Sequence, residues 1–247
     1  MALMNRNTLK NFFKRGQIPT EVNFADLIDS VVNKIDDGFT KTPKDGMVLA
    51  PEGTSHKLLS FYENMRDKNP AWSVSLESEQ ADKGFSVVEG KEATRLFIAE
   101  GGNVGIGTTQ PSHQLSVNGA IGMRSRVGTY AAGTVPGDGK WHTILQDLKG
   151  SNAFEIMAYA GGAKGRGKYA MLHATALNNY GGRHSPINKT QSYFRFFWHK
   201  IDVRWIRKKG SFEYSLQLKT KSHYGINEAG IPYSIEYQIT QLWNRGH

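Results

Sequence analysis

Apolar side chains recur at helical spacing in the first forty residues. A short helix is predicted after Asn7, a good N-cap residue, and it would end at Gly16. A second helix is predicted to begin at Thr20 or Asn23 and to end near Gly38. Both helices are amphipathic, so each needs another surface to cover its apolar face.

The second predicted helix carries an apolar stripe with the spacing of a heptad seam. Its members are Phe24, Ile28, Val31 and Ile35. A helix this short is marginally stable alone in water, so the stripe needs a partner. Three copies side by side would bury the stripe, and packing against the helix's own domain would serve equally well.

Alternation with period two replaces helical spacing after residue 70. Short strands are predicted at 72–76, 85–88 and 95–98, separated by Gly, Asp and Lys. Two further strands, divided by a Thr-Thr-Gln-Pro turn, have their apolar positions at Val104, Ile106, Leu115 and Val117. Two such strands bury too little apolar surface to be stable alone, so another copy of the chain is the expected partner.

The second half of the chain reads as a succession of strands without a long helix. The predicted strands are 141–148, 153–160, 168–176, 192–198, 201–207, 212–222 and 233–243. Alternation along them is typical of half-buried antiparallel strands and predicts a β-sandwich, with jelly-roll-like connections. The chain is therefore predicted to be mainly β, with a helical segment at 1–40, a β-rich segment at 41–121 and a β-sandwich at 122–247.

Composition excludes several classes of protein. The chain has no cysteine, so neither a disulfide framework nor a cysteine metal site exists. No apolar run reaches the ~18 residues of a transmembrane helix, and residues 1–6 lack the apolar core of a signal peptide. We therefore expect a protein made in the cytoplasm; if it acts outside the cell, it leaves by lysis or as part of a particle.

Charge separates the two halves of the chain. Residues 1–120 carry 13 Lys and Arg against 15 Asp and Glu, whereas residues 121–247 carry 18 against 7. The basic half also holds four of the five tryptophans. Such asymmetry predicts an anionic partner for that half, although solubility and non-specific charge explain it equally well.

The segment 102–119, with the sequence GNVGIGTTQPSHQLSVNG, resembles the G-N-V-G-I-G-T-x-x-P-x-x-x-L-x-V-x-G segment of trimeric phage-type tail fibres. Related segments join a stalk to a C-terminal head in fibres and adhesins of contractile injection systems. The resemblance implies a homotrimer in which residues 1–40 attach to tail or baseplate proteins, 41–121 form a stalk and 122–247 form a receptor-binding head. A glycine-rich β-hairpin in a monomeric domain is the alternative. The residues expected at trimer contacts are Phe24, Ile28, Val31, Ile35, Val104, Ile106, Leu115 and Val117.

Three polar segments of the predicted head carry candidate ligand-binding residues. The first is rich in glycine, so backbone amides and cations could together accept a phosphate or carboxylate, although a mobile solvated loop is the simpler explanation. The second segment, 178–184, has a composition common in loops that recognise glycans. The third segment, 207–210, is a predicted hairpin tip. The candidates are Lys164, Arg166 and Lys168, then Tyr180, Arg183 and His184, then Arg207, Lys208 and Lys209.

Aromatic and basic residues interleave in 193–200 and in 203–210. Proteins that bind single-stranded nucleic acids combine stacking aromatics with cations in this way. Proteins that bind sugars do so too, because an aromatic face packs on a pyranose ring while Arg or Lys pairs with acidic groups. The simpler explanation is a pair of strands that buries the aromatic residues and exposes the cations.

Signatures of enzymes and metal sites are weak. The glycine-rich segments complete neither a P-loop nor a dinucleotide-binding pattern. Glycoside cleavage needs paired carboxylates, and no pair stands out among the acids of the head, such as Glu155, Glu213 and Glu236. His173 or His199 could hold a metal if a trimer presented it three times on its axis, but an ordinary histidine is the simpler explanation. No cofactor or metal is therefore expected.

The residues and the resemblance together favour a non-enzymatic adhesin of a phage or phage-like contractile injection system. Its head would bind an anionic cell-surface glycan or lipopolysaccharide, and no nucleic acid. The first alternative is a structural cap or baseplate component of the same kind of particle. The second is a fibre enzyme that degrades polysaccharide.

Overall fold

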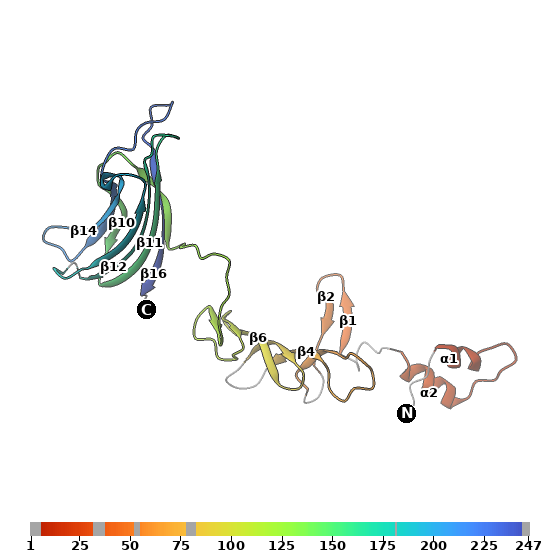
Figure 1. Cartoon of the computed structure of the whole chain (residues 1–247). Coiled ribbons are helices and arrows are strands. Elements are labelled where there is room, and N and C mark those ends of the chain that lie inside the picture. Colours follow the sequence, from red (N-terminus) through yellow and green to blue (C-terminus); the bar gives the residue numbers. More distant parts are fainter. Residues whose placement is uncertain (1–5, 32–37, 52–54, 78–82, 181, 244–247) are drawn as a thin grey trace. The chain divides into compact units, whose positions relative to one another are not determined.

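The computed structural model describes residues 6–31, 38–51, 55–77, 83–180 and 182–243. The chain divides into two compact units, Met1–Gly122 and Met123–His247, so the predicted boundary after residue 121 lies one residue before the division. The described chain is mainly β, with two short N-terminal helices and several largely antiparallel sheets (Figure 1). No helix in these ranges is both long and apolar enough to cross a membrane.

The N-terminal helices are α1 (Arg6–Phe12) and α2 (Glu21–Asp29). Thr20 begins α2 through a capping box: the Asn23 amide donates to Thr20 Oγ1 at 3.4 Å, and the Thr20 amide donates to Asn23 Oδ1 at 3.0 Å. The rings of Phe13 and Phe24 meet edge to face at 5.5 Å and hold the two helices together.

The second helix is shorter than predicted. It ends at Asp29, with Ser30 as its C-cap, and does not reach Gly38 as a continuous helix. The Ser30 hydroxyl donates to the Asp26 carbonyl at 2.6 Å, a local bond of the kind that competes with helix propagation. Ile35, the last member of the predicted stripe, lies outside the described residues.

Short strands make up the rest of the first unit. β1 (Phe39–Thr42) and β2 (Gly46–Leu49) form an antiparallel hairpin. A six-stranded sheet follows in sequence order: β3 (Lys57–Phe61), β4 (Trp72–Glu77), β5 (Gly84–Glu89), β6 (Ala93–Ala99), β7 (Val104–Ile106) and β8 (Leu115–Val117). Its neighbours are antiparallel except β7 and β8, which are parallel.

The segment 102–119 builds this parallel pair rather than a β-hairpin. Parallel strands ordinarily need a crossover of a dozen residues or more, but here residues 107–114 alone connect them. The Asn103 side-chain amide donates to the Pro111 carbonyl at 3.1 Å, and Gly107 has a φ of +67°. A Cβ on Gly105 would lie 2.1 Å from the Thr108 carbonyl oxygen. The asparagine and glycines of the segment are therefore needed for this tight connection.

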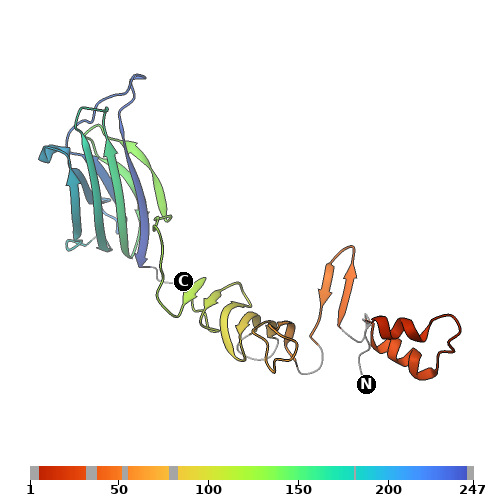
Figure 2. The ribbon, with the colours of Figure 1, turned by 45° about the vertical axis from the view of Figure 1, so that its right-hand side comes forward.

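The second unit is a two-layered β-sandwich (Figures 1 and 2). One layer has five antiparallel strands in the order β13 (Ile187–Tyr193), β12 (Tyr169–Asn179), β11 (Ser151–Gly161), β16 (Ser234–Trp243) and β9 (Ala131–Pro136). The other layer has three, in the order β10 (His142–Leu148), β15 (Tyr214–Thr220) and β14 (Ile201–Arg207). This order of the described strands does not establish the predicted jelly-roll connections.

The core of the second unit lies between its two sheets. Every second residue along the middle of β11 and β12 is buried, and most of these are alanines. Larger side chains, such as Leu216 and Leu218, face them from the three-stranded sheet. Among the described residues, all buried hydrophobic side chains except Leu9 and Phe97 belong to this unit. It therefore holds a core of its own.

The strand predicted at 192–198 is wrong. The edge strand β13 covers 187–193, and the chain then leaves the sheet at Arg195, whose φ is +66°. A 3₁₀ turn, η2 (Phe197–His199), follows. Three consecutive aromatic residues at 196–198 do not show the apolar-polar alternation of a half-buried strand, because a strand would place them on both faces. The polar edge strand before them also lacks a strong apolar pattern.

Candidate functional site

Strand direction divides the loops of the sandwich between two ends. The loops 137–141, 162–168, 194–200 and 221–233 lie at one end, which we call the aromatic end. The loops 149–150, 180–186 and 208–213 lie at the opposite end, where the chain also enters β9.

This division separates the predicted binding residues into two groups. Lys164, Arg166 and Lys168 belong to the aromatic end, whereas Tyr180, Arg183, His184, Arg207, Lys208 and Lys209 belong to the opposite end. The longest strands between the ends have 11 residues, or about 36 Å at ~3.3 Å per residue. A single small ligand therefore cannot touch both groups.

The aromatic end is built around the loop 194–200. The Phe196 amide donates to the Phe194 carbonyl at 3.0 Å, and the His199 amide donates to the Phe196 carbonyl at 2.9 Å. His199 is buried, and its Nδ1 donates to the Phe194 carbonyl at 2.8 Å, so Nδ1 carries the ring proton. The buried Tyr224 hydroxyl donates to the His199 carbonyl. These bonds hold the loop in one conformation.

The fixed loop leaves its large rings exposed. Phe194, Phe196, Phe197 and Trp198 are exposed by 52%, 46%, 60% and 43%. The rings of Phe196 and Trp198 stack at 4.5 Å with an interplanar angle of 10°, and Phe197 meets Trp198 edge to face at 5.1 Å. Contiguous exposed aromatic surface of this kind marks binding sites on soluble proteins.

Cations and the glycine-rich loop border these rings. Lys200 Nζ lies 4.9 Å from the centre of the Tyr193 ring, and the Arg195 guanidinium lies 5.4 Å from the centre of the Phe194 ring. A Cβ on Gly167 would lie 3.2 Å from the Phe194 ring. Glycine therefore lets the basic loop 162–168 pack directly against the aromatic loop.

The three predicted cations of the glycine-rich loop differ in their contacts. Lys168 Nζ donates to the His223 carbonyl at 2.6 Å, which ties this loop to 221–233. Lys164 and Arg166 are exposed, and no ion pair within the described chain involves either. Both side chains are therefore available to an anion.

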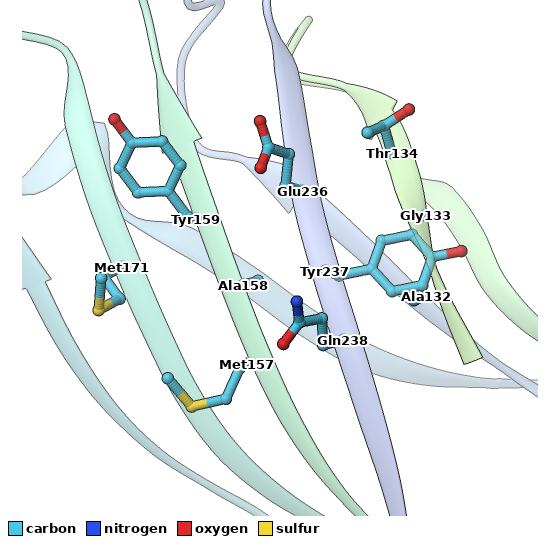
Figure 3. A pocket seen from close by; sticks show the side chains of 10 residues that line it. All are labelled: Ala132, Gly133, Thr134, Met157, Ala158, Tyr159, Met171, Glu236, Tyr237 and Gln238. Atoms are coloured by element: carbon cyan, nitrogen blue, oxygen red, sulfur yellow. The ribbon is translucent and has the colours of Figure 1, made fainter. Parts of the chain in front are cut away.

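A groove crosses the outer face of the five-stranded sheet beside the aromatic loop. Two adjoining pockets, of about 370 and 200 Å³, share Tyr159 and Met171. Figure 3 shows the first pocket, to which β11, β12, β16 and β9 contribute. The second pocket reaches Tyr193 and Phe194 at the base of the aromatic loop. The groove and the exposed rings thus form one continuous surface.

The basic residues of the opposite end are partly engaged by the chain itself. Glu213 forms ion pairs with Lys208 at 3.0 Å and with Lys149 at 3.1 Å. The hydrogen bond from Lys208 lowers the pKa of Glu213 and, in turn, raises the pKa of Lys208. Arg183, Arg204 and Arg207 line a pocket of about 430 Å³, so a second cationic site lies at this end.

Three other predicted residues of the opposite end are exposed: Tyr180, His184 and Lys209. Tyr180 has a φ of +49°, an unusual conformation for a bulky residue. Its amide donates to the Gly150 carbonyl at 2.8 Å, which holds that conformation. The backbone of Tyr180 therefore contacts the turn at 149–150.

The acids and histidines that the sequence singled out lie apart from one another or form ion pairs within the chain. Glu155 pairs with His173 at 2.9 Å and with Arg126. Glu236 lies opposite Tyr159, four residues along β11 from Glu155, or about 13 Å away, beyond the ~5–10 Å of glycosidase carboxylates. His199 lies in η2 and not in a strand as predicted. Within the described ranges of one chain, no three His, Asp or Glu side chains could hold a metal.

The interleaved aromatic and basic residues of 193–200 indicated a binding surface as one alternative, but the simpler prediction, a strand that buries the rings, is wrong. The available signal was the unbroken aromatic run at 196–198, which is incompatible with alternation. In the structure these rings, the neighbouring cations and the groove suit a ligand with apolar ring faces and acidic substituents. No protein-family model matches this chain, and no curated protein matches it.

Proposed function

We propose that the chain is a non-enzymatic, homotrimeric adhesin of the tail-fibre kind, carried by a phage or phage-like contractile injection system. In this proposal residues 1–40 attach to tail or baseplate proteins and 41–121 form a trimeric stalk. Residues 122–247 are the head, which binds an anionic cell-surface glycan or lipopolysaccharide. The resemblance of 102–119 to fibre segments supports the assignment to this class.

The observation that carries the proposal is the exposed apolar surface of the first unit. Within its described residues, Phe97 is the buried hydrophobic side chain of the six-stranded sheet, while many large ones are at least 36% exposed. They include Leu59, Phe61, Trp72, Leu76, Phe85, Ile98, Ile106 and Leu115. Removing such surface from water contributes about 25 cal/mol per Å², and neighbouring copies of the same chain supply the cover.

The expected trimer contacts are consistent with this role. Phe24, Ile28 and Val31 on and beside α2 are more than half exposed. Ile106 and Leu115 are also exposed, and Val104 and Val117 are half-buried. Each can therefore contribute apolar area to a contact between chains.

The receptor-binding role of the head rests on its charge and on the aromatic end. Residues 121–247 carry 18 Lys and Arg against 7 Asp and Glu, which favours anionic surfaces. Three heads on one fibre would gain avidity from their effective concentration, so weak single sites would suffice.

Two measurements on the full chain test the proposal. Light scattering should give a mass near three times 27.5 kDa, and the monomer mass would contradict the trimer.

Binding of the labelled protein to bacterial cells should fall at least about tenfold when Phe197 and Trp198 are both replaced by Ala. Phe212→Ala, which removes an exposed ring at the opposite end, is the matched control. Capture of acidic particle subunits without binding to cells or glycans would instead favour a structural cap.

A further inference from the structure

We propose that the groove on the outer face of the five-stranded sheet holds the sugar rings of a linear acidic polysaccharide. This inference rests on the adhesin function and assigns its ligand to one surface. The groove runs from Glu236 and Gln238 on β16, past Tyr159 on β11, to the rings at the base of the aromatic loop.

Tyr159 separates the two halves of the groove and offers a flat surface. A Cβ on Gly161 would lie 2.7 Å from the Tyr159 hydroxyl oxygen and 3.2 Å from ring atom Cζ, so the ring lies over Gly161 and along the sheet. The side chain is 42% exposed, between Met171 on β12 and Glu236 on β16. Such a ring suits stacking against the C–H bonds of a pyranose face.

Groups that bind hydroxyls line the part of the groove farther from the aromatic loop. Gln238 donates and accepts, the Thr134 hydroxyl does both, and the Glu236 carboxylate accepts. Figure 3 shows all three around the first pocket, on the neighbouring strands β16 and β9. The core of a subunit interface is depleted of charged groups, so Glu236 favours a hydroxyl-rich ligand here over a second copy of the head.

Cations border the other part of the groove. Tyr193 and Phe194 line the second pocket, and Lys200 and Arg195 lie over these two rings. A carboxylate on the glycan therefore sits near Lys200 and Arg195, while uncharged ring faces lie over Tyr159. Charge complementarity sets the orientation of the polysaccharide in the groove. An acidic group beside Glu236, in the pocket farther from the aromatic loop, would be repelled by the Glu236 carboxylate.

The experiment uses the full chain and an array of purified acidic capsular and O-antigen polysaccharides. For each polysaccharide that binds, the carboxyl-reduced form is the neutral probe. We expect Tyr159→Ala to weaken binding about tenfold or more and Tyr159→Phe to retain it, since the ring remains. Leu177→Ala, on the same outer face but outside the groove, is the matched control. Carboxyl reduction of the polysaccharide and Lys200→Gln should each weaken binding. Their combined effect should be no larger than either effect alone, because both remove the same ion pair.

Each outcome decides one point. If the protein binds polysaccharide but Tyr159→Ala binds as the wild type does, the groove is overturned and the adhesin function stands. If no cell and no polysaccharide is bound, the adhesin function itself fails. If Tyr159→Ala instead lowers the mass in light scattering, the groove is a contact between heads. Equal binding of the carboxyl-reduced form would overturn the acidic ligand.

Discussion

Gly105 shows how one residue fixes a local conformation in the first unit. The Thr108 carbonyl oxygen lies 2.1 Å from the position of a Cβ. Gly105 also pairs with Phe97 on β6 and with Ser116 on β8, so its backbone cannot move away without breaking a strand pair. Glycine is therefore required at position 105 because any Cβ would clash with the Thr108 carbonyl oxygen, and not because of its φ angle.

We expect Gly105→Ala to destabilise the β6–β8 region by about 1–3 kcal/mol, the usual cost of overpacking a tight site. Hydrogen–deuterium exchange of peptides from 84–117 measures the change as faster exchange. Gly122→Ala is the control, because no heavy atom lies within 4 Å of its Cβ position. Equal protection in the two variants would show that the Thr108 carbonyl moves aside freely.

Two buried tyrosines couple the stability of the head to alkaline pH. Burial raises the pKa of Tyr224 and the pKa of Tyr214 above the ordinary 10.0. The native state therefore keeps these protons at a pH where the unfolded chain releases them. Their contribution to stability is complete below about pH 10 and is lost as the pH rises above it.

Tyr224→Phe should reduce this alkaline loss of stability. We expect a lower free energy of unfolding at pH 7, because the hydrogen bond to the His199 carbonyl is gone, and a shallower fall between about pH 9 and pH 11. Urea unfolding of the full chain over a pH series measures both effects. Tyr180→Phe removes the hydroxyl of an exposed ring instead. If the free energy of unfolding of Tyr224→Phe falls as steeply with pH as that of the wild type, Tyr224 does not cause the alkaline loss of stability.

At the scale of elements, the aromatic loop depends on a buried side chain, that of His199. His199 is 4% exposed, and its ring holds the Phe194 carbonyl from within. The exposed rings at 194–198 are therefore arranged by a buried anchor. Its removal would free the loop while every exposed ring remains.

We expect His199→Ala to weaken binding to cells about as much as removal of the rings does, since a mobile loop loses its preorganised surface. The binding assay with labelled full-length protein measures this, together with the melting temperature of the head. Leu177→Ala, which removes an exposed side chain of β12 and leaves the loop untouched, is the control. Full binding by His199→Ala would mean that the loop holds its shape without the anchor.

Local patterns succeeded for strands and failed at the aromatic loop. Alternation placed the strands around 153–160, 201–207 and 233–243 within a few residues of β11, β14 and β16. The same rule wrongly predicted a strand at 192–198 from the apolar residues there. In the structure the chain turns at Arg195, which has a positive φ. It also missed β9 and β3, whose alternation is weak.

At the scale of the whole molecule, the two units differ in how they are stabilised. The second unit buries a core between two sheets, whereas the first leaves most of its large apolar side chains exposed. The first unit should therefore depend on self-association, while the second should not.

Replacing Ile106 and Leu115 together by Ser should lower the mass toward that of one chain and should lower the melting temperature of the first unit. The reason is the loss of apolar area that would otherwise be buried between copies. Light scattering and calorimetry measure the two effects, and the transition of the head should not change. Met65→Ser, at a residue 95% exposed in a loop, is the control. An unchanged mass would exclude these side chains from the contact.

The sequence by itself determined the mainly β class, the short N-terminal helices and the charge difference between the halves, because alternation, capping and composition are local properties. Tertiary structure decided that β7 and β8 are parallel, and it decided which loops meet. It joined 162–168 to the exposed rings of 194–200 and put 180–184 and 207–209 at the other end. Strand order and direction arise from hydrogen bonds between residues far apart in the chain, and no local pattern encodes those pairings.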